Sequence, residues 1–194
     1  MRLLLIGAPG AGKGTQAVRI AEHFGIPHIS SGDLLRRHIA EETSIGRSVR
    51  DTMRRGDLVS DGIVMDVLRK PVEAAARNGG YVLDGFPRTV EQAEVAYLVA
   101  RDIGASVQVA LFLDVPREEL IRRLVARGQE SGRTDDTEDV IKHRLEVYEE
   151  HTMPLLDYYQ RRERLVTVNG SRPMDEVTWS VIVQLQKVRR EFAG

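Results

Sequence analysis

Apolar residues along the chain form short continuous runs that alternate with longer stretches of mixed polarity. The runs that have the length of buried strands are Leu3–Ile6, Pro27–Ser30, Tyr81–Leu83, Val107–Leu113 and Leu165–Val168. Patterns with a helical period fill the gaps, at residues 13–24, 61–77, 90–102, 116–127, 136–152 and 174–192. Strands that alternate with helices predict parallel pairing through right-handed crossovers. We therefore expect an α/β fold, a doubly wound five-stranded parallel sheet with helices on both faces.

Two segments interrupt this rhythm. Residues 31–59 hold helical patterns without a strand, and residues 128–135 (GQESGRTD) are polar and contain glycine between two strong helices. In an α/β sheet, ligands bind beyond the carboxyl ends of the strands, so insertions there are candidate lids. The alternative is an insertion without a function of its own.

The composition narrows the class of protein. A length of 194 residues with a net charge of −1 predicts one globular domain with insertions, and gives no sign of a nucleic-acid or membrane partner. The absence of cysteine excludes disulfides, thiolate metal sites and cysteine nucleophiles. The apolar runs are too short to cross a bilayer, and the first residues lack a secretory cleavage pattern, so we expect a cytoplasmic protein.

Residues 7–15, GAPGAGKGT, join the first predicted strand to the first predicted helix. Their glycine and lysine spacing in this context predicts a phosphate-binding loop (P-loop). Glycines let backbone N–H groups converge on a phosphate, and Lys13 would reach the outer phosphates. The hydroxyl residue that normally follows the lysine is replaced by Gly14, and Thr15 comes one position later.

Two acidic residues are candidates for the magnesium shell of a bound nucleotide. Asp84 ends an apolar strand near the P-loop, although an aspartate before a glycine is also a common turn residue. In the segment SSGDLLRR, Ser30, Ser31 or Asp33 could cap the next helix. Arg36 lies in the first turn of that helix, where a cation opposes the helix dipole, and this indicates an anionic partner.

Four arginines bracket the polar loop at 128–135. Arg123 and Arg127 are four residues apart and share a helix face, and Arg133 and Arg144 follow. We interpret them as a phosphate clamp, with solvated surface arginines as the alternative. The five histidines show no metal-ligand spacing, and no serine–histidine–acid arrangement is evident.

The segments GAPGAGKGTQ, SSGDLLR, GDLVSD, DGFPRTVEQ and GRTDD closely resemble the nucleoside monophosphate kinases, and among them the adenylate kinase family. The resemblance runs nearly end to end. It implies Mg²⁺-dependent, reversible phosphoryl transfer from ATP to AMP to give two ADP, with lids that close over both nucleotides in a monomer. It also implies a core at 1–29, 60–126 and 137–194, an AMP-binding insertion at 30–59 and a short lid at 127–136.

The resemblance assigns a role to each matching position. The positions implied to bind ATP are Gly10, Ala11, Gly12, Lys13, Gly14, Thr15, Arg123, Arg127, Gly170 and Arg172. Those implied to bind AMP are Ser31, Arg36, Asp57, Leu58, Val59, Gly85, Phe86, Pro87, Arg88, Gln92, Arg133 and Arg144. The implied catalytic residues are Lys13, Arg88, Arg123, Arg133 and Arg144. Asp84 and Asp33 are implied to hold Mg²⁺ through water, without a direct protein ligand.

Two positions depart from the family pattern. The lid segment is short and lacks the zinc-binding cysteines of some relatives, so no zinc is expected. Asp57 stands where lysine is common, which leaves a side-chain contact to AMP open. Three alternatives also stay open: a kinase of UMP, CMP or another monophosphate, a kinase of a small-molecule hydroxyl with Asp33 as base, and a nucleotide-dependent switch.

Overall fold

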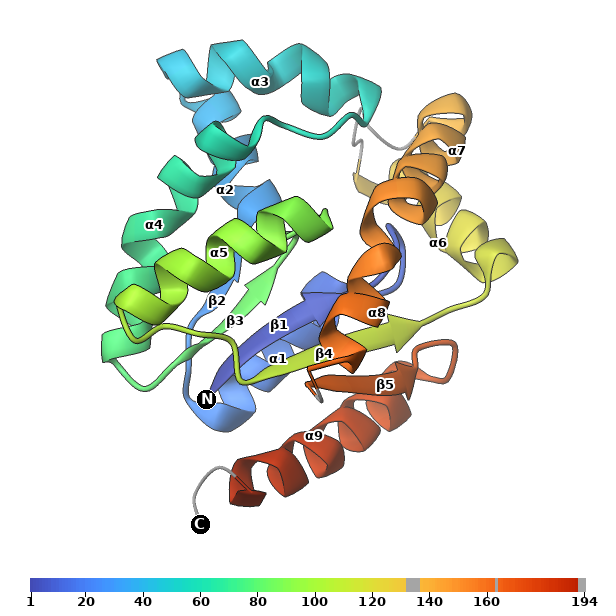
Figure 1. Ribbon diagram of the computed structural model, residues 1–194. Helices are drawn as coiled ribbons and strands as arrows, with labels where there is room; N and C mark the ends of the chain where they lie inside the picture. Colours follow the sequence, from blue (N-terminus) through green and yellow to red (C-terminus); the bar gives the residue numbers. More distant parts are fainter. Residues whose placement is uncertain (132–136, 163, 192–194) are drawn as a thin grey trace.

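The structure is a computed structural model that describes residues 1–131, 137–162 and 164–191. A five-stranded parallel sheet with strand order β2-β3-β1-β4-β5 forms its centre (Figure 1). The strands are β1 (Arg2–Ile6), β2 (His28–Ser30), β3 (Tyr81–Asp84), β4 (Val109–Asp114) and β5 (Leu165–Asn169). The expected doubly wound α/β fold is therefore confirmed.

Helices cover both faces of the sheet. They are α1 (Lys13–Phe24), α2 (Ser31–Ala40), α3 (Ser44–Arg55), α4 (Asp61–Arg77), α5 (Val90–Asp102), α6 (Arg117–Ser131), α7 (Glu138–Val147), α8 (Pro154–Gln160) and α9 (Met174–Glu191). A π-helical turn, Tyr148–Thr152, continues α7. No helix in the described ranges combines the length and apolar character that a bilayer crossing would need.

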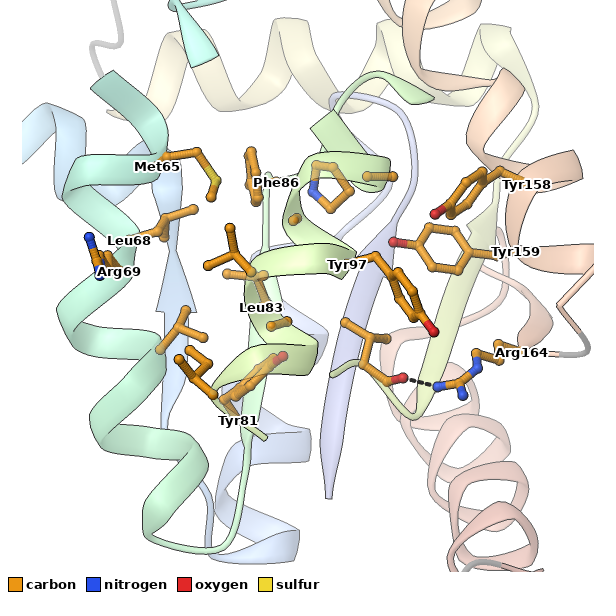
Figure 2. Close-up of a pocket in the computed structure, with 18 of the residues that line it drawn as sticks. Met65, Leu68, Arg69, Tyr81, Leu83, Phe86, Tyr97, Tyr158, Tyr159 and Arg164 are labelled. Atoms are coloured by element: carbon orange, nitrogen blue, oxygen red, sulfur yellow. Dashed lines mark hydrogen bonds between the residues drawn. The ribbon is translucent and has the colours of Figure 1, made fainter. Parts of the chain in front are cut away.

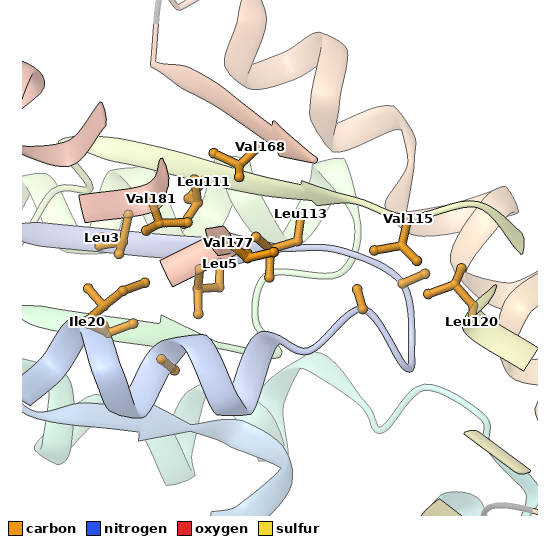
Figure 3. Packing of buried hydrophobic residues seen from close by; sticks show 14 of the residues in the cluster. Leu3, Leu5, Ile20, Leu111, Leu113, Val115, Leu120, Val168, Val177 and Val181 are labelled. Atoms are coloured by element: carbon orange, nitrogen blue, oxygen red, sulfur yellow. The ribbon is translucent and has the colours of Figure 1, made fainter. Parts of the chain in front are cut away.

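The central strand β1 shows why the sheet is buried on both faces. Side chains alternate along a strand, so Leu3 and Leu5 point to one face, while Leu4 and Ile6 point to the other. The first pair packs with residues of α1 and α9, such as Ile20 and Val181 (Figure 3). The second pair packs with residues of α2, α4, α5 and α8. Apolar burial on both faces therefore fixes the sheet between two helical layers.

Capping and glycine residues determine where helices α2 and α1 begin. The side chain of Ser30 accepts a hydrogen bond from the backbone N–H of Asp33 at 3.2 Å and caps α2. Of the three capping candidates, Ser30 is thus the one that the structure uses. Helix α1 starts directly after Gly12, whose φ of 90° lies in the left-handed region that favours glycine.

Besides shifts of one or two residues at several element ends, three elements differ from the sequence prediction. Strand β4 begins at Val109 rather than at Val107. Helix α6 continues to Ser131, although the sequence predicted a polar loop from Gly128. Helix α8 was not predicted at all, because its seven residues are too few for a clear period and its stability comes from packing.

The carboxyl ends of the parallel strands meet at one edge of the sheet. The P-loop follows β1 there, Asp84 ends β3, and Gly170 follows β5. Figure 1 shows α2 and α3 on one side of this edge, and α6 and α7 on the other. This edge is the place where doubly wound sheets bind ligands.

Candidate active site

A cleft of about 550 Å³ lies at the carboxyl edge of the sheet. Its walls come from the P-loop, the start of α2, the end of β3, and residues of α6, α7 and the β5–α9 connection. The cations among its described lining residues are Lys13, Arg36, Arg88, Arg123, Arg127, Arg144 and Arg172. Among the described lining residues, the acidic ones are Asp33 and Asp84. This excess of positive charge suits a polyanionic ligand.

The P-loop holds its shape through two glycines with positive φ. Gly10 and Gly12 have φ values of 86° and 90°. A Cβ atom at Gly10 would also lie 2.9 Å from Leu124 Cγ, so no larger residue fits there without a shift. The loop leads directly into the N-terminus of α1, whose free N–H groups favour an anion.

Lys13 is folded back onto the loop that carries it. Its Nζ donates hydrogen bonds to the carbonyl oxygens of Gly7 at 2.7 Å and Ala8 at 3.0 Å. The pKa of the Lys13 ammonium is lowered to about 8, chiefly by burial; the nearby Asp84 carboxylate acts in the opposite direction, and the guanidinium groups of Arg88, Arg144 and Arg127 add to the lowering. An arriving phosphate would offer this ammonium group a stronger acceptor than two carbonyls.

Gly14 occupies an open position. A Cβ atom there would meet no heavy atom within 4 Å, and both Gly14 and Thr15 are exposed in the cleft wall. Protein packing therefore does not require glycine at this position. The glycine at position 14 is instead explained by the space that it leaves for a bound ligand.

A smaller hollow of about 60 Å³ lies between the 30–59 segment and the β3–α5 connection. Ten of the positions that the sequence singled out line it: Ser31, Arg36, Asp57, Leu58, Val59, Gly85, Phe86, Arg88, Gln92 and Arg144. The sequence analysis missed its apolar walls, Leu35, Met53 and Val64. Their helical spacing looked like ordinary core packing, and no sequence signal separates the two.

Gln92 and Thr152 hold the β3–α5 connection in place. The amide of Gln92 donates to Asp61 Oδ1 at 2.6 Å and accepts from the backbone N–H of Arg88 at 2.7 Å. The hydroxyl of Thr152, a residue that the sequence analysis missed, donates to the Arg88 carbonyl at 2.8 Å. The Arg88 Nε also donates to the Gly85 carbonyl at 2.9 Å. These bonds fix the backbone from which the Arg88 side chain projects.

The Asp57 side chain bonds to protein groups. Its carboxylate contacts Arg55 Nε at 2.8 Å and His143 Nε2 on α7 at 2.7 Å. Hydrogen bonds from His143 and Arg55 lower the pKa of the Asp57 carboxyl. A donor group of a bound nucleotide would therefore share this carboxylate with Arg55 and His143. The contact also joins the 30–59 segment to α7.

A third hollow, of about 90 Å³, shares part of its lining with each of the other two. Its lining includes Lys13 and, from the smaller hollow, Gly85, Arg88 and Arg144. Arg88 and Arg144 line all three spaces. A group transferred between two ligands at this position would therefore lie close to the positive charges of Lys13, Arg88 and Arg144.

The two aspartates offer oxygen ligands for a hard cation. Asp84 is almost fully buried, and its Oδ2 lies 3.9 Å from His28 Nε2, which finds no hydrogen-bond partner among the described residues. Asp33 pairs with Arg36 at 2.5 Å. The described residues hold no cluster of three or more potential metal ligands. Two carboxylates fit Mg²⁺, which keeps most of its water and binds chiefly through substrate phosphates.

The remaining predicted residues lie around the cleft. Arg123 donates to Glu119 at 2.7 Å on α6, and it lines the cleft together with Arg127, Gly170 and Arg172. Pro87 lies in the wall of the third hollow. Arg133 lies outside the described residues. The sequence analysis also missed Gln16, a buried cleft residue whose amide donates to the Met174 carbonyl at 3.3 Å.

The chain resembles known proteins over nearly all of its length. A family model described as adenylate kinase matches residues 5–164. A protein named adenylate kinase from Kocuria rhizophila is 44% identical over 186 residues, 96% of this chain and 99% of its own. One from Phocaeicola vulgatus is 42% identical over 188 residues, 97% of this chain and 100% of its own. A protein from Nostoc sp. named adenylate kinase 1 is 44% identical over 177 residues, 91% of this chain and 94% of its own.

Proposed function

The chain belongs to the adenylate kinase family, and we propose that its cleft transfers the terminal phosphoryl group of ATP to AMP, reversibly, to give two ADP. The reaction needs two anionic nucleotides to be held end to end. The large cleft at the P-loop suits ATP, and the smaller hollow beside the 30–59 segment suits the base and ribose of AMP.

One observation carries this proposal most directly. Arg88 and Arg144 line the large cleft, the smaller hollow and the third hollow that shares lining residues with both. Cations at that junction would screen the repulsion between the two nucleotides and stabilise charge on the transferred group. A binding module or a nucleotide switch has no need of a second anion site joined to the first in this way.

The proposed mechanism needs no general base. An AMP phosphate oxygen is already ionised and nucleophilic at neutral pH, so alignment and charge stabilisation supply the catalysis. Lys13 would leave the carbonyls of Gly7 and Ala8 and follow the transferred phosphoryl group. Arg88 and Arg144 would hold the acceptor phosphate in line with it, and Arg123 and Arg127 would bind ATP from α6.

The residues of the cleft fit a magnesium ion that enters with ATP. The family uses Mg-ATP in general, and we propose that Asp84 and Asp33 order the water around the ion instead of binding it directly. When bound, Mg²⁺ neutralises charge on the phosphates. The side chains themselves orient that water and restrict where the phosphates lie.

Closure of two segments would protect ATP from hydrolysis. We propose that residues 30–59 act as the AMP-binding insertion and 127–136 as a short lid, and that both fold over bound nucleotides to exclude water. The Asp57–His143 contact joins the insertion to α7 and supports this arrangement. We also propose that the enzyme acts as a monomer in the cytoplasm.

A panel of acceptors tests the function. Purified protein receives Mg²⁺, ATP and one of AMP, UMP, CMP, GMP or a small alcohol, and ADP formation is followed by coupled assay. We expect rapid turnover with AMP and at most slow turnover with the others. A preference for UMP or CMP would assign a different monophosphate kinase activity. No turnover with any monophosphate would contradict the proposal.

A further inference from the structure

A second cavity, of about 270 Å³, lies between α4, α5, α8 and the sheet (Figure 2). Its floor includes Tyr81 and Leu83 of β3, which are almost fully buried. Its mouth includes Tyr97 and Ile103 of α5, which are 46% and 41% exposed. The cavity is thus open to solvent on one side and apolar within. Phe86 and Pro87 are its lining residues with an expected role toward AMP, and no role proposed for ATP or Mg²⁺ involves its described lining.

Two tyrosines supply the cavity with hydroxyl groups that make no hydrogen bond to the described part of the chain. Tyr158 and Tyr159 are only 8% and 6% exposed, and Figure 2 shows their hydroxyl ends directed away from α8, toward α5. Neither hydroxyl makes a hydrogen bond within the described part of the chain. By contrast, the hydroxyl of Tyr81, another tyrosine of the lining, donates to the Ala105 carbonyl at 2.6 Å. The hydroxyls of Tyr158 and Tyr159 are therefore available to bond with a molecule inside the cavity.

Charge at the cavity favours an anionic partner. The charged residues among its described lining are Arg69, Arg162, Arg164 and Asp66. Arg69 pairs with Glu73, and Arg164 donates to the Val107 carbonyl, whereas Arg162 has no ion pair with an acidic group among the described residues. The Arg162 guanidinium lies 3.6 Å from the centre of the Tyr158 ring, and therefore at the aromatic wall of the cavity. Burial raises the pKa of Tyr159 above its ordinary value, which keeps the hydroxyl protonated and able to donate.

We propose that this cavity binds a small aromatic carboxylate, with its ring between α4, α5 and α8 and its carboxylate at the tyrosine hydroxyls and Arg162. The rings of Tyr97, Tyr158, Tyr159 and Phe86 offer edge and face contacts to an aromatic ligand. The volume is sufficient, since a dry cavity of roughly 150 Å³ already holds benzene.

A ligand in this cavity would contact residues that also line the smaller hollow proposed for AMP. Phe86 lines the cavity and the smaller hollow, and Pro87 lines the cavity and the third hollow. Ala93 of the cavity wall follows Gln92 directly in the sequence. A ligand bound in the cavity would therefore shift the position of residues 84–88, in the β3–α5 connection. This coupling rests on the proposed function, whereas the binding site itself does not.

Direct binding is the first test, with 4-phenylbutyrate as the probe. Titration calorimetry should give a saturable 1:1 isotherm at millimolar or lower concentration. The matched controls are 4-phenylbutan-1-ol and 4-phenylbutylammonium, which keep the ring and chain but remove or reverse the charge. We expect the alcohol to bind several-fold more weakly and the ammonium compound not to bind. Absent binding of the carboxylate, or equal binding of all three probes, would overturn the proposal.

Variants then locate the site. Ala96→Trp fills the cavity from α5 and should weaken 4-phenylbutyrate at least tenfold, while Ala74→Trp on the exposed face of α4 should leave it unchanged. Tyr159→Phe keeps the ring, removes a free hydroxyl and should weaken binding about threefold to tenfold without lowering the melting temperature. Unchanged affinity in both Ala96→Trp and Tyr159→Phe would place the ligand elsewhere and overturn the assignment.

The coupling to the AMP hollow has its own readout. Saturating 4-phenylbutyrate should change the KM for AMP several-fold and the KM for ATP much less. By linkage, saturating AMP should change the affinity for 4-phenylbutyrate in the same direction. If the probe binds but neither constant moves, the site stands and its proposed link to the 84–88 connection is wrong. If the enzyme shows no activity with AMP, calorimetry still decides the binding site.

Discussion

When no phosphate is bound, the ammonium group of Lys13 donates its hydrogen bonds to carbonyl groups of the P-loop itself. Its pKa of about 8 is the sum of burial and neighbouring arginines, partly offset by Asp84. The bound phosphates of a nucleotide would reverse this balance, because an opposite charge favours the protonated form. Proton binding and nucleotide binding at this residue are therefore linked.

This linkage predicts proton uptake on nucleotide binding above about pH 8. Near neutral pH, Lys13 is already charged and takes up little. At about pH 9 it is mostly neutral in the free protein and must gain a proton when ATP arrives, so affinity should fall as the pH rises. Calorimetry in two buffers of different ionisation enthalpy measures the uptake. The variant Lys13→Met should abolish it, and equal uptake in that variant would contradict the assignment.

Arg88 should be essential to turnover. Removal of its guanidinium from the junction of the three hollows takes away a preorganised charge contact, so Arg88→Ala should lower kcat/KM for AMP well over tenfold. Arg37→Ala is a matched control, because Arg37 is exposed on α2 and pairs with Glu41. Steady-state kinetics with both variants checks this. Near-normal kinetics in Arg88→Ala would mean that the acceptor phosphate binds elsewhere.

Asp84 and Gly14 should differ in their effect on metal use. Asp84→Ala removes a carboxylate that would order water around Mg²⁺, and it should raise the Mg²⁺ concentration needed for half-maximal rate. Gly14→Ser restores the hydroxyl of the usual P-loop pattern, yet it should not improve metal use, because the proposed Mg²⁺ shell does not depend on it. A magnesium titration of the rate distinguishes the two. Improved metal use in Gly14→Ser would overturn this account.

The contact between the 30–59 insertion and helix α7 is a link between two elements. His143→Ala removes it and should raise the KM for AMP by up to about fivefold, with little change for ATP, because half-exposed ion pairs are worth up to about 1 kcal/mol. His151→Ala, at an exposed position beside Glu150, is the control. A double-mutant cycle with Asp57→Asn should show that the two effects are not additive. Full additivity would mean that the contact does not form in solution.

Elements with long, regular patterns were predictable from the sequence. Helices α1, α4 and α5 have the predicted bounds, because a buried stripe, a capping residue or a glycine marks each end. Helix α8 was not predictable, since its packing partners lie in distant parts of the chain. The extension of α6 past Gly128 overrides a polar, glycine-bearing sequence for which helical propensity alone gives little support.

The candidate site was likewise predictable from the sequence only in part. The P-loop and the DGFPR segment carry local chemistry, and the sequence alone singles out their residues. The walls of the smaller hollow come from Leu35, Met53 and Val64 on three helices, and only the folded chain brings them together. The roles of Asp57 and Thr152 depend on partners far away in sequence, His143 and Arg88, so no local pattern could reveal them.

For the whole molecule, we expect closure on binding both nucleotides. A two-headed inhibitor, with two adenosines joined by a polyphosphate chain, would span the cleft and the smaller hollow at once. It should lower the radius of gyration measured by solution X-ray scattering, while AMP alone should lower it less. An unchanged radius, with calorimetry showing that the inhibitor is bound, would contradict lid closure.

The order of the strands has a consequence for synthesis on the ribosome. Strand β1 comes first in the sequence, yet its neighbours β3 and β4 pair with it through residues as distant as Tyr81 and Val109. The leucines of β1 therefore have no neighbouring strand until β3 (Tyr81–Asp84) has been made, and they are not paired on both sides until β4 (Val109–Asp114) follows. During that interval the nascent chain presents an apolar strand to its surroundings, and such segments are prone to aggregate. Chaperone capture of the unfinished chain should end when β4 emerges, because only then can the centre of the sheet close.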